Sequence, residues 1–158
     1  MIALSRQLKR WLKYIAILLV VFVLCWQNST DSENVTNTTV GLVQKISVLL
    51  GKDLEYSTKL YYLVRKLGHG LVFLILAYAG HLAINSSATT VKASLLTSFI
   101  MSIFIAVMAE FMQAYTFGRS ASFTDAGINV AGTTVGILLG IFAEWISKVI
   151  TAKKAKTV

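Results

Sequence analysis

The sequence has 158 residues, of which 56% are hydrophobic and none is proline, and its formal charge is +8. This length suits one domain, residues 1–158, but the apolar content is too high for an ordinary soluble domain. The basic excess lies mainly at the two ends of the chain, where it is typical of membrane orientation rather than of nucleic-acid binding. The single cysteine, Cys25, lies in an apolar run and excludes an internal disulfide.

The first predicted membrane span covers about residues 12–27. Tyr14 to Cys25 is almost wholly aliphatic, and Trp11 and Trp26 frame it in the way that tryptophans mark membrane interfaces. No small-residue cleavage pattern follows, so a removed signal peptide is not favoured. We therefore expect a retained first transmembrane helix, at the lower end of spanning length.

The segment of about residues 28–66 is expected to lie outside the membrane. Its first part, 28–39, reads NSTDSENVTNTT and is typical of a polar linker. Residues 40–50 have apolar positions at helical spacing, and Gly51 is suited to end that helix. Residues 54–64 continue as a second amphipathic stretch. Neither stretch is long enough to span, so we expect short amphipathic helices on the membrane surface or over the bundle.

Three further apolar stretches are long enough to cross a bilayer. They cover about residues 67–84, 93–113 and 125–146. The sequence therefore predicts an all-α, polytopic membrane helix bundle with four transmembrane helices. Four spans place both termini on one side of the membrane, and the basic residues near both ends predict that this side is the cytoplasm.

The predicted topology brings polar residues from three helices to one face of the membrane. The start of the second span, the end of the third and the start of the fourth all lie at the outer face. Charges and amides at such depth are expensive and need partners. Spacings of three or four residues place several of them on shared helix faces. The residues concerned are Lys66, His69, Glu110, Gln113, Arg119, Asp125 and Asn129.

These side chains predict one polar pocket of mixed charge. The first turns of the second and fourth spans point free N–H groups outward, and helix N-termini attract anions. Lys66 and Arg119 add positive charge, and Glu110 and Asp125 are suited to pair with them or to accept protons. We expect the pocket to favour anionic groups such as phosphate or carboxylate.

Three glycines follow this polar set at four-residue spacing. Gly132, Gly136 and Gly140 form a flat strip on one face of the predicted fourth span. Such a strip lets another backbone approach closely in a membrane. We expect helix packing there, either within the bundle or between copies of the chain in an oligomer.

Two stretches of the sequence resemble the VanZ-like family of small bacterial membrane proteins. They read RKLGHGLVFLILAYAG (65–80) and AEFMQAYTFGRSASFTDAGINVAGTTVG (109–136). A proline that is common in the family's loop is absent, because the loop here reads Phe117-Gly118-Arg119. Gln27 and Ser29 are a weaker match to polar residues after the family's first helix. The resemblance implies a shared set of site residues: Lys66, His69, Glu110, Gln113, Arg119, Ser122, Asp125, Asn129 and Gly132.

The resemblance implies a multi-pass protein of the bacterial cytoplasmic membrane and cell envelope. The family is named for a protein linked to low-level resistance to the glycopeptide teicoplanin, and many members have no assigned activity. We therefore expect membrane lipids as partners and an anionic lipid-linked component, a cell-wall component or a glycopeptide as ligand. No nucleic acid and no cofactor are expected.

Two other functions stay open. One is a membrane hydrolase or transferase that acts on a phosphorylated lipid, with His69, Glu110 and Asp125 as candidate catalytic residues. The other is a structural or partner-binding helix bundle. A zinc site is not expected, because the chain lacks clustered histidines, and the G-x-S-x-G pattern of serine hydrolases is absent.

Overall fold

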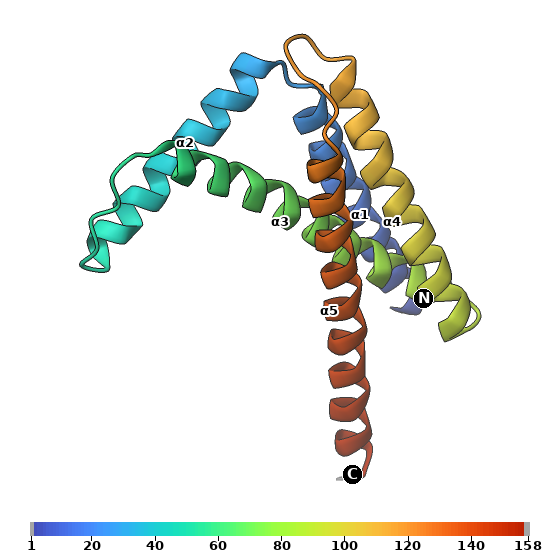
Figure 1. The fold of residues 1–158 in the computed structure, drawn as a ribbon. Coiled ribbons are helices and arrows are strands. Elements are labelled where there is room, and N and C mark those ends of the chain that lie inside the picture. The colour runs from blue at the N-terminus through green and yellow to red at the C-terminus, as the bar shows by residue number, and fades with distance from the viewer. Residues whose placement is uncertain (1, 157–158) are drawn as a thin grey trace.

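The computed structural model describes residues 2–156, and the side chains of residues 6–153. The described chain forms five α-helices and no strand, which confirms the all-α prediction (Figure 1). The helices are α1 (Ile2–Trp26), α2 (Ser29–Leu49), α3 (Thr58–Asn85), α4 (Val91–Ala114) and α5 (Phe123–Lys156).

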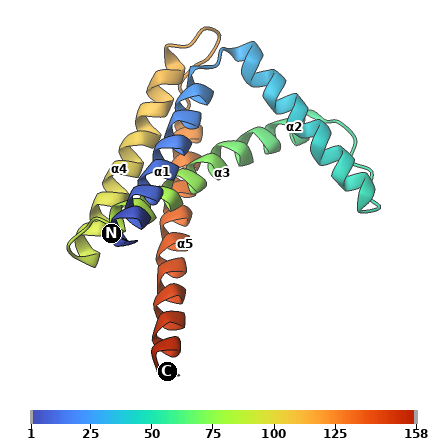
Figure 2. The same cartoon turned by 180° about the vertical axis from the view of Figure 1, so that it is seen from behind.

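The helices form a bundle from which two parts project. In both views α1 and α4 run side by side, α3 crosses them obliquely, α2 points away from them, and the C-terminal part of α5 extends beyond the other helices (Figures 1 and 2). The connection from α1 to α2 and the loop of residues 115–122 lie at one end, which we call the site end. The N-terminal part of α1 and the turn between α3 and α4 lie toward the other end, which we call the opposite end.

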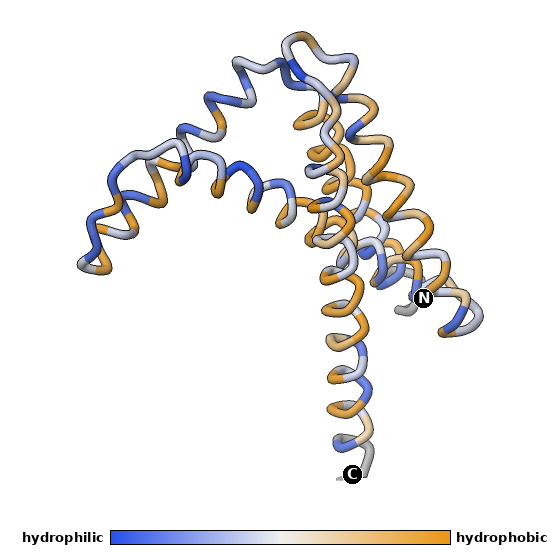
Figure 3. The backbone as a smooth tube through the Cα atoms, viewed as in Figure 1, coloured by the Kyte–Doolittle hydropathy of each residue, from blue (hydrophilic) through white to orange (hydrophobic). Residues whose placement is uncertain are grey.

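Three helices are long and apolar enough to cross a membrane: α3, α4 and residues Phe123–Lys153 of α5. Their apolar stretches show as orange in Figure 3. The helix α1 does not join them, because it ends at Trp26 and a stretch of spanning length within it takes in Lys9, Arg10 and Lys13. The prediction of four spans is thus confirmed for three helices and not for the first.

The polar linker predicted for residues 28–39 is wrong, because this segment is the first half of α2. Asn28 caps the helix, and its Oδ1 accepts the N–H of Asp31 at 2.8 Å. Serine, threonine and asparagine have low helix propensity, which favoured a loop on sequence alone. Thr36 and Val40 are buried against the rest of the chain, and this packing overrides the propensity.

The second predicted amphipathic helix, over residues 54–64, is also not a separate element. The helix α3 begins at Thr58, capped by the hydroxyl of Ser57, and continues unbroken into the predicted second span. The end of α2 lies where the sequence indicated it, because Gly51 adopts a positive φ of 73° directly after the helix. The segment between the first two predicted spans therefore contains one long helix and the first turns of α3.

The glycine strip of α5 packs on α3. A Cβ at Gly132 would overlap the backbone carbonyl of Gly70, and one at Gly136 would overlap the carbonyl of Leu74. The pairing of α3 with α5 is the most extensive helix contact in the chain. A second copy of the chain would have to displace α3 in order to use this strip.

Candidate functional site

The structure places the predicted site residues at the site end, where three polar interactions join the helices. Of these residues, only His69 and Gln113 line the cavity described below, within the described part of the chain. The first is an ion pair between Lys66 Nζ of α3 and the carboxylate of Asp125 at the start of α5. The side chain of Lys66 is 33% exposed and that of Asp125 11% exposed. The pair therefore lies at the edge of the bundle and ties the first turn of α5 to α3.

The second interaction centres on Glu110, which is 5% exposed near the end of α4. Its Oε1 accepts the side-chain N–H of Asn129 at 3.0 Å, and its Oε2 accepts the backbone N–H of Ser122 at 3.3 Å. The hydroxyl of Ser122 in turn accepts the backbone N–H of Asp125 at 3.3 Å. Glu110 thus joins α4 both to α5 and to the residue that caps α5.

The third interaction holds the loop of residues 115–122. Arg119 Nη2 donates to Gln113 Oε1 at 2.6 Å, and Nη1 donates to the carbonyl of Gln27 at 3.4 Å. Burial, and then the positive charge of Arg65, lower the pKa of Arg119, although a guanidinium stays protonated in proteins. The family's common loop proline is absent, and Gly118 makes the turn with a φ of 74°.

Beside this network lies a cavity of about 250 Å³. The helices α1, α2 and α3 contribute most of its lining, and α4 contributes Gln113. Its polar lining includes Arg65, His69, Gln27 and hydroxyl-bearing residues of α2. Its apolar lining includes Leu24 and other aliphatic and aromatic side chains. A cavity with one polar side and one apolar side is suited to an amphiphilic molecule.

The cavity contains one cationic residue that the sequence analysis did not select. Arg65 lies four residues before His69, on the same face of α3, and this spacing was the signal available in the sequence. Among the described side chains Arg65 has no ion-pair partner, since the two ion pairs are Lys66 with Asp125 and Arg10 with Glu144.

The site end therefore carries more positive than negative charge. Three cations, Arg65, Lys66 and Arg119, lie near two carboxylates, Glu110 and Asp125. Arg119 bonds to amide and carbonyl oxygens, and Asp125 is paired with Lys66. Within the described part of the chain neither Arg65 nor Arg119 has an ion pair, and of the two only Arg65 lines the cavity.

His69 lines the cavity and is partly buried. It makes no hydrogen bond to another described residue. Across the described residues no three His, Cys, Asp or Glu side chains gather in a way that would hold a metal ion. Arg65 and His69 line the cavity with N–H groups that can donate to an anion.

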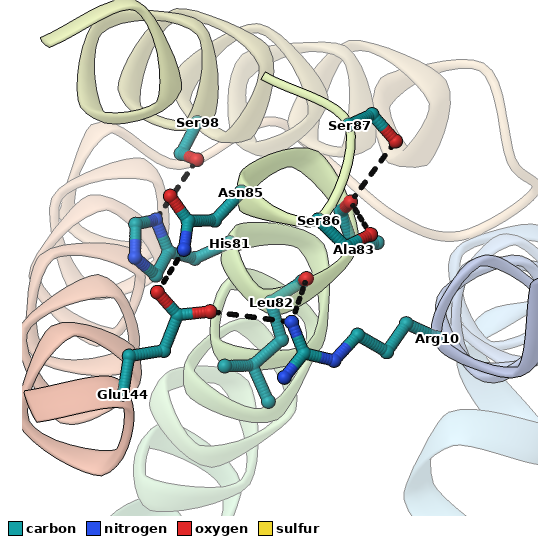
Figure 4. Close-up of polar contacts among 9 residues, drawn as sticks. All are labelled: Arg10, His81, Leu82, Ala83, Asn85, Ser86, Ser87, Ser98 and Glu144. Carbon is teal, nitrogen blue, oxygen red and sulfur yellow. Dashed lines mark hydrogen bonds and ion pairs between the residues drawn. The ribbon is translucent and has the colours of Figure 1, made fainter. Parts of the chain in front are cut away.

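The opposite end holds a second polar cluster, which the sequence analysis did not predict (Figure 4). Arg10 of α1 pairs with Glu144 of α5 at 3.3 Å, and the amide of Asn85 of α3 donates to the other oxygen of Glu144. His81, only 2% exposed, lies 3.0 Å from the hydroxyl of Ser98 of α4 through Nδ1. This cluster connects four helices.

An all-helical chain with three helices apolar enough to span a bilayer is an integral membrane protein. The sequence profile of the VanZ/LLP1 family matches residues 11–144, a range that contains the site end and most of the opposite-end cluster. The chain therefore belongs to the VanZ-like family. Neither a curated protein nor a solved structure gives a match to it.

Proposed function

We propose that this VanZ-like protein binds an anionic, lipid-linked component of the bacterial cell envelope in the cavity at its site end. The observation that carries the proposal is Arg65, a cation with no ion-pair partner among the described residues, beside a cavity that is apolar on its other side. A partly buried guanidinium with no carboxylate beside it is suited to receive an anion from outside the chain. A phosphate also matches the planar, multi-donor geometry of arginine.

The proposal includes the placement of the chain in the cytoplasmic membrane. We take α1 as a fourth span, because residues 14–25 are apolar and the stems of Lys9, Arg10 and Lys13 are long enough to carry their charges to the interface. Both termini then lie in the cytoplasm and the site end faces outward. A protease-sensitive tag at either terminus should be cut only after the cells are opened, and cleavage in intact cells would contradict this placement.

The family's link to teicoplanin fits the same proposal. A ligand that is lipid-linked, or is a cell-wall component, lies at the outer face of the membrane, where a glycopeptide also acts. We therefore propose that this protein binds an envelope component whose availability alters sensitivity to glycopeptides. Deletion and re-expression of the chain should then shift the teicoplanin concentration that inhibits growth, and re-expression with Arg65→Gln should not restore it.

Purified protein in lipid nanodiscs provides the direct test of binding. We expect it to retain phosphatidylglycerol in preference to phosphatidylcholine, because only the first headgroup has a net negative charge for Arg65. Soluble glycerol phosphate serves as a second probe and separates a lipid ligand from free phosphate. Equal retention of both lipids, with no effect of Arg65→Gln and no binding of glycerol phosphate, would overturn the proposal.

One observation favours a second function, a membrane enzyme acting on a phosphorylated lipid. His69 lines the cavity and bonds to no other described residue, so its imidazole is free to act as an acid or base toward a ligand. Incubation with phosphorylated lipids decides between the two functions. Turnover that disappears with His69→Ala but survives with Leu67→Ala, a 62% exposed neighbour on α3, would show an enzyme. Binding without turnover supports the first proposal.

A further inference from the structure

An apolar groove lies beside the cavity, along α1 and α3. It has a volume of about 310 Å³. Val21, Leu24 and Val72 line both the cavity and the groove, so the two spaces share a wall. Ala16, Val20 and Ile75 extend the groove beyond the cavity, and all of its lining residues are apolar.

The direction of the groove is that of a lipid chain in a bilayer. Along α1 it extends from Leu24, near the site end, to Ala16, toward the middle of the helix. Eight residues of α-helix span about 12 Å. Half of the hydrocarbon core of a membrane is about 15 Å thick. In the placement proposed above, with α1 as a fourth span, the groove runs from the level of a headgroup through most of one leaflet.

The polar part of the cavity complements a headgroup that carries both charge and hydroxyls. Arg65 and His69 lie on the α3 side, and Ser32, Thr36 and Thr39 lie on the α2 side. Thr36 and Thr39 donate their hydroxyl protons to carbonyls of their own helix, so their oxygens are free to accept from a ligand. A glycerol phosphate group presents an anion to the first set and hydroxyl donors to the second.

We propose that the chain binds a whole anionic lipid, with its phosphate at Arg65 and one of its hydrocarbon chains in the groove of α1 and α3. This inference rests on the proposed function and deepens it, because a site that recognises only headgroups would not use the groove. The lining residues that the two spaces share, and the cation in the cavity, distinguish this lipid from the general lipid contact of the bundle.

Photocrosslinking tests the inference. The probe is phosphatidylglycerol with a diazirine at mid-chain, incorporated into nanodiscs with the full-length protein, and matched phosphatidylcholine is the control probe. We expect the anionic probe to label the peptides that carry residues 16–24 and 72–75 several-fold more than the control probe does. Arg65→Gln should reduce the labelling to the control level.

A pair of variants on α1 sharpens the test. Val20→Trp places a large side chain in the groove and should lower the labelling. Leu19→Trp places the same side chain at a neighbouring position of similar exposure, 61% against 58%, that does not line the groove, and should not lower it.

The outcomes separate the groove from the binding proposal. One outcome is preferential retention of phosphatidylglycerol with groove labelling that neither Arg65→Gln nor Val20→Trp changes. It would overturn the proposal that the groove holds a lipid chain, but not the proposed binding site. Loss of the lipid preference itself would overturn both. If Val20→Trp does not fold, the labelling of Arg65→Gln alone still decides the matter.

Discussion

Each end of the bundle has one ion pair that joins two helices, but the two ends differ in the charges around that pair. Lys66 pairs with Asp125 at the site end, and Arg10 pairs with Glu144 at the opposite end. The exposures of the paired side chains are nearly the same, 33% and 11% in one pair and 33% and 14% in the other. Each pair joins α5 to another helix. The two ion pairs therefore have the same role in helix packing.

The difference lies in what surrounds each pair. At the opposite end, Arg10 and Glu144 balance each other, and Asn85 supplies a further hydrogen bond. At the site end, the ion pair is accompanied by Arg65, a second cation that faces a cavity. Buried charge alone therefore does not identify a binding site in a membrane bundle, because satisfied pairs fix helices. A cation left unpaired beside a cavity does indicate one.

The largest loss of stability is expected from a change at the contact between α3 and α5, which we call the seam. Gly132→Ala places a Cβ into the carbonyl of Gly70, and a backbone atom has no rotamer through which to yield. We expect a loss of about 3 kcal/mol or more in the free energy of unfolding. Gly127→Ala on the same helix is the control, since a Cβ there meets nothing within 4 Å. Equal stability of the two variants in detergent would show that the seam is not closely packed.

Breaking either ion pair should cause a smaller loss of stability, of similar size for the two pairs. Asp125→Asn and Glu144→Gln each strand a partly exposed cation, so each should cost about 1–3 kcal/mol, less than a fully buried pair. Denaturation of the two variants checks this. The two variants should differ in lipid binding. Asp125→Asn adds to the positive charge of the site and should strengthen retention of phosphatidylglycerol. Weaker retention in Asp125→Asn than in Glu144→Gln would contradict the charge account.

The smallest effect is expected at the start of α2, which covers the cavity. Asn28→Ala removes the acceptor of the Asp31 N–H and should cost about 1 kcal/mol. Hydrogen exchange in the first turn of α2 should rise, while exchange at the seam stays unchanged. Asn34→Ala, within the same helix, is the control. Equal exchange in the two variants would show that the cap does not hold α2.

The sequence predicted the site end better than it predicted the rest of the fold. Lys66, Glu110 and Asp125 were recognisable because each lies within or beside an apolar run, where a charge demands a partner. Helix direction then placed them at one end. Which partners would form was not predictable, since Arg119 was an equal candidate for Asp125 until the loop conformation placed it against Gln113.

The missed features depend on contacts that no local pattern carries. The segment 28–39 has weak helix propensity, and only its cap and the burial of Thr36 and Val40 make it helical. Arg65 was not predicted as a site residue, because its importance depends on the cavity that α2 helps to line. Glu144 was a single acid near a predicted interface, and its role appears only when α1 and α3 bring Arg10 and Asn85 to it.

The central claim is that Arg65 serves binding, whereas Arg10 serves the fold. The most direct measurement compares Arg65→Gln with Arg10→Gln, recording for each the Kd for phosphatidylglycerol in nanodiscs and the free energy of unfolding. We predict that Arg65→Gln weakens binding about tenfold or more, as expected for the loss of a charge-assisted hydrogen bond, and changes stability by less than about 0.5 kcal/mol. Arg10→Gln should lower stability and leave the Kd unchanged. Equal effects of the two variants on both quantities would contradict the claim.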